Sequence, residues 1–191
     1  MKQAFLPRST RLPKRRYLVV LAATLLVAVG MVGVSFHPSV AYASGGGCGD
    51  FFFINQQTGY YLDVVNETPI HGASVDQCYN DGSPSEIWYL LGPASNGAYY
   101  VQNDNGGKYL DVAGASTANK ASVIQWYFNG NANQQWWFYG IGNGVYYIQN
   151  VNSGKYLDVA TSALGAQVIQ DTYEGWLSQE WNLVPANLPC G

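Results

Sequence analysis

Three aspartates recur in the same short motif, Tyr-Leu-Asp-Val, at regular intervals along the chain. Asp63, Asp111 and Asp158 are 48 and 47 residues apart. A carboxylate offers two acceptor oxygens to ligand hydroxyl groups, and a pair of carboxylates can also catalyse hydrolysis. The sequence contains no Ser-His-Asp set, no phosphate-binding glycine loop and no metal-ligand spacing of its cysteines. Hydroxyl recognition and carboxylate-based hydrolysis are therefore the two kinds of chemistry to consider.

The aspartates belong to a longer repeat. An asparagine lies eight residues before each one, and a later valine lies thirteen residues before a tryptophan. Internal repeats of this length indicate units that bury their apolar faces only by packing together. We expect the tryptophans to be core residues, because they recur in every copy. The repeated residues are Asn55, Asn103 and Asn150, then Val75, Val123 and Val168, and finally Trp88, Trp136 and Trp181.

Each repeat has the composition of short β-strands. Aromatic and β-branched residues alternate with polar ones, and Gly, Asn, Asp and Ser gather between the runs. Alternation places Leu110 and Val112 on one face of their strand and Asp111 on the other. The runs 105–107 and 152–154 (Asn-Gly-Gly and Asn-Ser-Gly) indicate hairpin turns. Each repeat then contains four strands, so we predict twelve in all.

Three such repeats could close in two ways, as a propeller or as a capped barrel. A propeller typically has at least four blades, so three repeats are too few for one. Six strands can instead close a barrel that three hairpins cap, which leaves no exposed sheet edge. We therefore predict an all-β fold, a β-trefoil of three four-stranded repeats with pseudo-three-fold symmetry. The domain is expected at residues 49–191, with repeats at about 49–92, 97–140 and 144–188.

The N-terminal segment has the organisation of an export signal. Residues 1–16 carry six basic residues and no acidic one, an apolar stretch follows at 17–34, and Ala41-Tyr42-Ala43 has small residues at its ends. We predict a secretion signal at residues 1–43, a short linker at 44–48 and a secreted, extracellular domain. An uncleaved anchor is the alternative, because the apolar stretch approaches the ~20 residues that span a bilayer.

Removal of the signal leaves an acidic domain. Lys108, Lys120 and Lys155 are its only lysines or arginines, and all twelve Asp and Glu lie in it, so its net charge is 3 − 12 = −9. Nucleic acids and anionic membranes require a basic surface, and we expect neither as a partner after cleavage. Abundant Tyr, Trp, Asn, Gln and Gly favour neutral polar ligands. No cofactor and no metal is predicted.

Three cysteines follow the signal, namely Cys48, Cys78 and Cys190. In an oxidising compartment two of them can bridge and leave the third free. A trefoil brings its first and last strands together, and Cys48 and Cys190 lie at opposite ends of the domain sequence. We therefore predict a Cys48–Cys190 disulfide.

The repeats resemble the ricin B-type lectins, a family of β-trefoil carbohydrate-binding modules, over residues 49–188. The markers are the Tyr-Leu-Asp-Val strand and a Gln-x-Trp element, which is intact at residues 134–136 and 179–181 and altered to Glu-x-Trp at 86–88. The resemblance implies a shallow sugar pocket in each repeat. An aspartate accepts hydrogen bonds from sugar hydroxyls, an aromatic ring stacks on the pyranose, and an Asn-Gln pair completes the site. Galactose- or xylose-type sugars would suit the family.

Carried over by position, these roles are complete only in the second repeat. There the resemblance assigns sugar binding to Asp111, Trp126, Asn133 and Gln134, although Ile124 stands where the family often has a polar residue.

The other two repeats lack the stacking ring at its expected position. The third keeps Asp158 and Gln179 but has Asp171 in place of the ring, so Tyr173 or Trp176 would have to supply one from the loop. The first repeat keeps its aspartate but departs at the other positions, and we expect it not to bind. Its departures are Cys78, Ser85 and Glu86.

Taken together, the sequence predicts a secreted, carbohydrate-binding lectin that is not an enzyme. The recurrent aspartates should face outward from different lobes, whereas glycoside hydrolysis needs two carboxylates roughly 5–9.5 Å apart. Two alternatives remain, a small glycoside hydrolase and a trefoil that binds or inhibits a protein.

Overall fold

The computed structural model describes residues 49–186, and their regular elements are strands and single turns of 3-10 helix. All twelve predicted strands are present. They are β1 (Asp50–Asn55), β2 (Tyr61–Val64), β3 (Val75–Cys78), β4 (Trp88–Leu91), β5 (Tyr99–Asn103), β6 (Tyr109–Val112), β7 (Ala121–Trp126), β8 (Gln135–Gly142), β9 (Val145–Asn150), β10 (Tyr156–Val159), β11 (Val168–Asp171) and β12 (Glu180–Pro185). The short helices are η1 (Val65–Glu67), η2 (Pro84–Glu86), η3 (Ala113–Ala115), η4 (Ala132–Gln134) and η5 (Leu177–Gln179).

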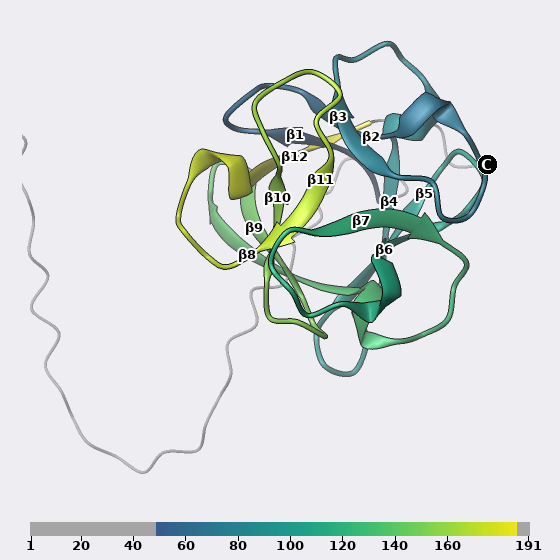
Figure 1. Ribbon diagram of the computed structural model, residues 1–191, viewed down its shortest axis with the longest axis vertical. Helices are drawn as coiled ribbons and strands as arrows, with labels where there is room; N and C mark the ends of the chain where they lie inside the picture. Colours follow the sequence, from purple (N-terminus) through teal and green to yellow (C-terminus); the bar gives the residue numbers. More distant parts are fainter. Residues whose placement is uncertain (1–48, 187–191) are drawn as a thin grey trace, which may run out of the picture. The chain divides into compact units, whose positions relative to one another are not determined.

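Six strands pair in a closed antiparallel ring, in the order β1, β12, β9, β8, β5, β4 and back to β1. The remaining strands form three hairpins, β2–β3, β6–β7 and β10–β11. β7 pairs with β11, and isolated bridges join Ser74 to Ile124 and Asp76 to Gln167. Strands β3, β7 and β11 consequently converge between the three lobes (Figure 1). The prediction of a β-trefoil is confirmed.

Three tryptophans anchor the core in equivalent ways. Trp88, Trp136 and Trp181 are fully buried in one apolar cluster with residues from every repeat. Each indole Nε1 donates a hydrogen bond to the backbone carbonyl of the leucine in the Tyr-Leu-Asp-Val strand, at 2.9, 3.1 and 3.1 Å respectively. The core position expected for these tryptophans is confirmed.

The repeated asparagines connect neighbouring repeats. Asn55, Asn103 and Asn150 are buried, and each Nδ2 donates to a carbonyl in the 3-10 turn of the preceding repeat, in cyclic order. Asn150, for example, donates to the carbonyl of Asn133 at 3.0 Å. The second repeat's 3-10 turn is therefore held in place by the third repeat.

A second set of buried amides makes a similar connection. Gln77, Gln125 and Gln170 each lie two residues after the repeated valine, and each Nε2 donates to two carbonyls in a loop of another repeat. Gln170 donates to the carbonyls of Ser116 and Ala118 at 2.9 and 3.0 Å. Such bonds matter because a buried carbonyl without a donor is costly.

The three glutamines differ at their acceptor oxygen. The Oε1 of Gln170 accepts a hydrogen bond from Ser153 Oγ at 2.6 Å, and that of Gln77 accepts one from Thr58 Oγ1 at 2.8 Å. Gly106 occupies the corresponding turn position in the second repeat and has no hydroxyl. Within residues 49–186 the buried Gln125 Oε1 accordingly has no partner. A Cβ at Gly106 would lie 2.8 Å from the Pro69 Cβ, which explains why the turn carries glycine.

The predicted repeat boundaries differ from the strands at one place. β8 continues to Gly142, beyond the expected end of the second repeat at residue 140, because it forms a long hairpin with β9. The signal at 1–43, the linker at 44–48 and both cysteines of the predicted disulfide lie outside the described residues. Cys78 is free. No helix among residues 49–186 is long and apolar enough to cross a membrane.

The side-chain oxygen of Gln170 accepts a hydrogen bond and that of Gln125 does not. We therefore predict that replacing these two glutamines lowers the free energy of unfolding by different amounts. Gln170→Leu leaves two carbonyls without a donor and leaves the Ser153 hydroxyl only its longer bond, to Asn150 Oδ1 at 3.5 Å, so it should destabilise the fold by about 2–3 kcal/mol. Gln125→Leu removes an oxygen that has no partner, so its cost should be about 1 kcal/mol smaller. Urea unfolding of both variants measures the difference. Equal costs would contradict the role given to Ser153.

Candidate functional site

The register of the β6–β7 hairpin brings the predicted second-repeat residues together. Asp111 lies opposite Ile124, and Trp126 follows two residues later on the same face of the sheet. The 3-10 turn η4 supplies two amides to the carboxylate. Asn133 Nδ2 donates to Oδ1 of Asp111 at 2.8 Å, and Gln134 Nε2 donates to Oδ2 at 2.9 Å. Asp111, Asn133 and Gln134 are thus joined by hydrogen bonds, and Trp126 lies on the same face of the sheet as Asp111. All four residues assigned from the resemblance are therefore close together.

Gln134 is a brace between the aspartate and the following loop. Its Nε2 also donates to the carbonyl of Tyr127 at 2.7 Å, and its Oε1 accepts the backbone N–H of Asn129 at 2.9 Å. Gln134 is fully buried, so it holds the Asp111 carboxylate in position but does not itself line the pocket.

A pocket of about 370 Å³ opens over the Asp111 carboxylate. The Trp126 ring is 37% exposed and forms one wall, and the edge of His71 from the first repeat packs against it, with ring centroids 4.9 Å apart. The pocket thus presents a partly free aromatic face beside a carboxylate. Its lining residues are Asp111, Gly114, Ala115, Ile124, Trp126, Asn129, Asn131 and Asn133.

The electrostatics of Asp111 follow from its burial. The residue is only 3% exposed, and removal from water raises the pKa of its carboxyl group, while the hydrogen bonds from Gln134 and Asn133 act in the opposite direction. Each of its oxygens has one protein donor, so each keeps capacity for a further one. The site can therefore accept two hydrogen bonds from adjacent hydroxyl groups.

The third repeat builds a similar support around Asp158. Its Oδ1 accepts the backbone N–H of Val159 at 2.7 Å, and its Oδ2 accepts Gln179 Nε2 at 3.0 Å. Gln179 Nε2 also donates to the carbonyl of Thr172 at 2.8 Å. Asp158 and Gln179 consequently reproduce the arrangement of Asp111 and Gln134.

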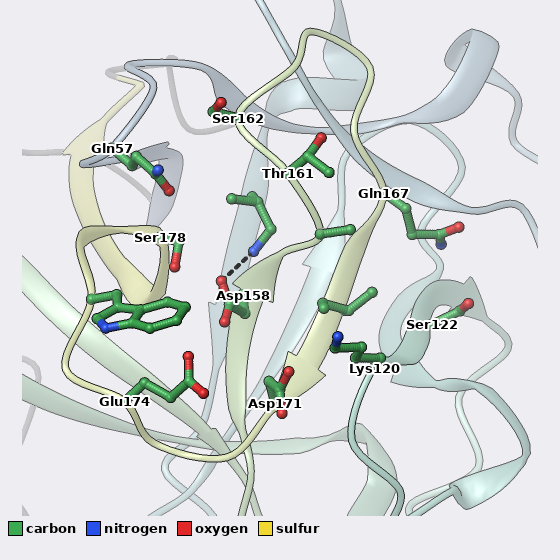
Figure 2. A pocket seen from close by; sticks show the side chains of 14 residues that line it. Gln57, Lys120, Ser122, Asp158, Thr161, Ser162, Gln167, Asp171, Glu174 and Ser178 are labelled. Atoms are coloured by element: carbon green, nitrogen blue, oxygen red, sulfur yellow. Dashed lines mark hydrogen bonds between the residues drawn. The ribbon is translucent and has the colours of Figure 1, made fainter.

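The pocket of the third repeat is larger, at about 570 Å³, and differs in its aromatic residue (Figure 2). Tyr173 does not line it, because its ring packs against Tyr147 and Tyr156, each with ring centroids 5.1 Å apart. Trp176, from the loop before η5, does line it. Of the two aromatic residues considered from the sequence, Trp176 is therefore the one placed at the pocket.

In the first repeat, Glu86 replaces the bracing glutamine. It is fully buried, its Oε1 accepts the backbone N–H of Asp81 at 3.1 Å, and its Oε2 has no partner among the described residues. Burial raises the pKa of Glu86 to about 7, and the charges of Asp81 and Asp63 add to the increase. A carboxylate cannot donate to Asp63 as an amide does, so this repeat is braced less well.

The sequence interpretation did not identify several residues that line the third pocket. Lys120 and Ser122 come from the second repeat and Gln57 comes from the first, so only the assembled trefoil brings them to this place. Glu174 lies in the loop after β11 and carried no repeat signal. Within residues 49–186, no group of three or more His, Cys, Asp or Glu side chains could hold a metal ion.

The buried Glu86 predicts a pH-dependent difference in stability. Its pKa is raised in the folded state, so the fold loses stability as pH rises from about 4.5 to about 7. Glu86→Gln supplies an amide donor in place of a carboxylate. It should increase the free energy of unfolding by about 1–3 kcal/mol at about pH 8, with little gain at about pH 4.5.

Urea unfolding at several pH values measures this difference. Asp76, whose pKa is raised to about 6, contributes equally to both proteins and cancels. Glu67→Gln removes an exposed carboxylate and controls for net charge. Parallel stability profiles for parent and Glu86→Gln would show that Glu86 is not the titrating group.

Comparison with known proteins places these features in a family. The family model described as "Ricin-type beta-trefoil lectin domain-like" matches residues 39–126, 85–171 and 132–187. Together these matches cover well over half of the chain, and their starting points are 46 and 47 residues apart, as the repeat requires. The search of curated proteins gave no match.

Solved structures share the fold. A designed three-fold symmetric protein, ThreeFoil, is 38% identical over 71% of this chain and 98% of its own, with a TM-score of 0.69. An exo-β-1,3-galactanase from Clostridium thermocellum is 31% identical over 76% of this chain but only 31% of its own, with a TM-score of 0.70. A ricin B-like lectin from Macrolepiota procera, solved with lactose, is 16% identical over 74% of this chain and 98% of its own, with a TM-score of 0.60.

The last of these is similar in fold alone. The family match agrees with the three-fold repeat and with the Asp–Gln–Trp arrangement of the second and third repeats. The chain belongs to the family of ricin-type β-trefoil lectin domains.

Proposed function

We propose that the protein is a secreted lectin that binds a glycan or polysaccharide through the second-repeat pocket. The observation that carries the proposal is the pairing of Asp111, fixed by two amides, with the partly exposed ring of Trp126. The Asp111 oxygens accept hydrogen bonds from two adjacent sugar hydroxyls, and Trp126 stacks on the C–H face of the pyranose. Asn133 and Gln134 keep the carboxylate in position for this contact.

A galactose-type sugar is the first ligand to test. The galactanase is 31% identical to this chain, and its name denotes an enzyme that acts on a galactan. The matched region is less than a third of the galactanase, so its activity is not transferred, and the likeness supports only the choice of sugar. Xylose-type sugars form the second arm of the panel.

Binding without catalysis is part of the proposal. The recurrent aspartates lie in three separate hairpins, and Asp111 is committed to two amide donors. Glycoside hydrolysis instead needs an acid and a second carboxylate on either side of one bond. Analysis of the oligosaccharides after prolonged incubation with the protein tests the hydrolase alternative, since any shortened product would favour it.

Removal of the stacking ring is predicted to weaken binding without unfolding the domain. Trp126→Ala should lower the affinity for the bound sugar at least about tenfold, or ~1.4 kcal/mol, because the C–H face loses its partner. Asp111→Asn should weaken binding similarly. It should also reduce stability, since an amide N–H₂ would face the donors of Asn133 or Gln134.

Isothermal titration against monosaccharides and oligosaccharides measures affinity, with thermal unfolding as the control for stability. Phe128→Ala is the matched control, because Phe128 is an exposed aromatic residue outside the pocket lining. Trp136→Ala removes a core anchor and should cost about 3–5 kcal/mol of stability. Undiminished binding by Trp126→Ala would place the site elsewhere.

Export is predicted to yield a mature chain that begins near Ser44. A positively charged segment, an apolar segment and a small-x-small segment together direct cleavage after Ala43. Intact mass of protein collected from the medium measures the mature terminus, and alkylation before and after reduction reports the proposed Cys48–Cys190 disulfide. Cell-associated protein that retains Met1 would favour a membrane anchor.

A further inference from the structure

The third-repeat pocket combines side chains from all three repeats. Gln57 follows β1, Lys120 immediately precedes β7, Ser122 lies near the start of β7, and the remaining lining residues belong to the third repeat. Its volume of about 570 Å³ exceeds that of the second-repeat pocket, about 370 Å³, and lies within the range of small-ligand sites. This cavity therefore exists only in the assembled trefoil, and its lining differs from that of the second-repeat pocket.

That chemistry is acidic. Asp158 lies opposite Ile169 in the β10–β11 register, and Asp171, two residues further along β11, is on the same face. Figure 2 shows Asp158, Asp171 and Glu174 around the same opening, with Lys120 as the cationic residue among the labelled side chains. Three carboxylates against one ammonium group give the pocket a net negative charge. In the second repeat, Trp126 occupies the place that Asp171 has here.

Two of these carboxylates are largely removed from water. Asp171 is 9% exposed, and within the described residues its side chain accepts one hydrogen bond, from the adjacent Thr172 N–H to Oδ1 at 2.7 Å. Its Oδ2 has no protein donor there. Burial raises the pKa of Asp158, and the charge of Asp171 adds to this effect. A bound cation would relieve the repulsion between the two groups.

An exposed aromatic ring completes the pocket. Trp176 is 63% exposed, and together with Gln57 and Ser178 it also lines an adjoining hollow of about 390 Å³. Tryptophan is the aromatic residue that best attracts a cation to its face, and it also stacks on the C–H face of a sugar ring. The two hollows offer room for more than one ring of an oligosaccharide.

We propose that the third-repeat pocket is a second binding site, selective for a pyranose that carries a protonated primary amine. Asp171 Oδ2, with Asp158 and Glu174, accepts the ammonium group, and Trp176 supports the ring. Lys120 opposes the ligand charge and so limits the affinity. The inference rests on the proposed carbohydrate-binding function, but it does not depend on the second-repeat pocket.

The test compares two ligands that differ only at the amine, which is charged in one and acetylated in the other. A tetramer of β-1,4-linked glucosamine and its fully N-acetylated form are titrated by calorimetry at about pH 6 and moderate salt. The amine-bearing tetramer should bind at least about tenfold more tightly, because acetylation removes the charge. Asp171→Asn should lower its affinity about tenfold, and Lys120→Gln should raise it about two- to threefold. Trp176→Ala should weaken it, whereas Phe128→Ala, at an exposed residue that lines neither pocket, should leave it unchanged.

Each outcome decides the proposal. Equal affinity for the two tetramers, or an unchanged affinity in Asp171→Asn, would overturn the selectivity for an amine. A loss of amine binding in Trp126→Ala would move the site to the second repeat and overturn the assignment. Galactoside binding measured in the same samples separates the two proposals, because it can persist when the third pocket fails. Thermal unfolding verifies that each variant remains folded.

Discussion

Buried amide side chains join each repeat of this trefoil to its neighbours. The asparagines before the Tyr-Leu-Asp-Val strands bond to carbonyls of the preceding repeat in cyclic order, and the glutamines after the repeated valines bond to loops of that same repeat. A repeat in isolation would leave these groups without partners and its apolar face in water. The barrel, the tryptophan core and the position of each 3-10 turn all depend on this cyclic set of bonds.

The residues that connect the repeats and the residues that line the pockets are different. This difference explains how the three repeats could diverge. The amides and tryptophans that connect the repeats are the same in all three copies, whereas the stacking position holds Cys78, Trp126 or Asp171. That position lies on the outer hairpins and contributes little to the shared core. These three residues are outside the buried apolar cluster, so substitution there changes the surface of a lobe at small cost to the core.

Much of the fold was predictable from the sequence. A three-fold fold of β-strands produces a three-fold repeat in the sequence and an alternation of apolar and polar residues within each strand. Strand period placed Asp111 on the opposite face from Leu110 and Val112, and the recurrence of Trp136 marked the core. Alternation could not reveal that Asp111 would be buried beneath Asn133 and Gln134. The glutamines after the valines, such as Gln170, carried a repeat signal that the sequence interpretation left unused.

The third pocket was less predictable for two reasons. The loop after β11 has no periodicity, and its course depends on Gly175 in a left-handed conformation and on the bonds of Gln179, so Trp176 and not Tyr173 reaches the pocket. Lys120 approaches from another repeat, and a position of that kind follows only from tertiary packing.

The pairing of β1 with β12 has a consequence for the synthesis of the protein. These strands close the barrel, yet Phe53 and its partner Leu183 are separated by almost the whole domain sequence. Contacts of such long sequence separation form late and slowly. β1 can pair with β2 and β4 of its own repeat, but its pairing with β12 must wait until the last strand has left the ribosome. The barrel of a nascent chain therefore stays open during synthesis, as the export that we propose would require.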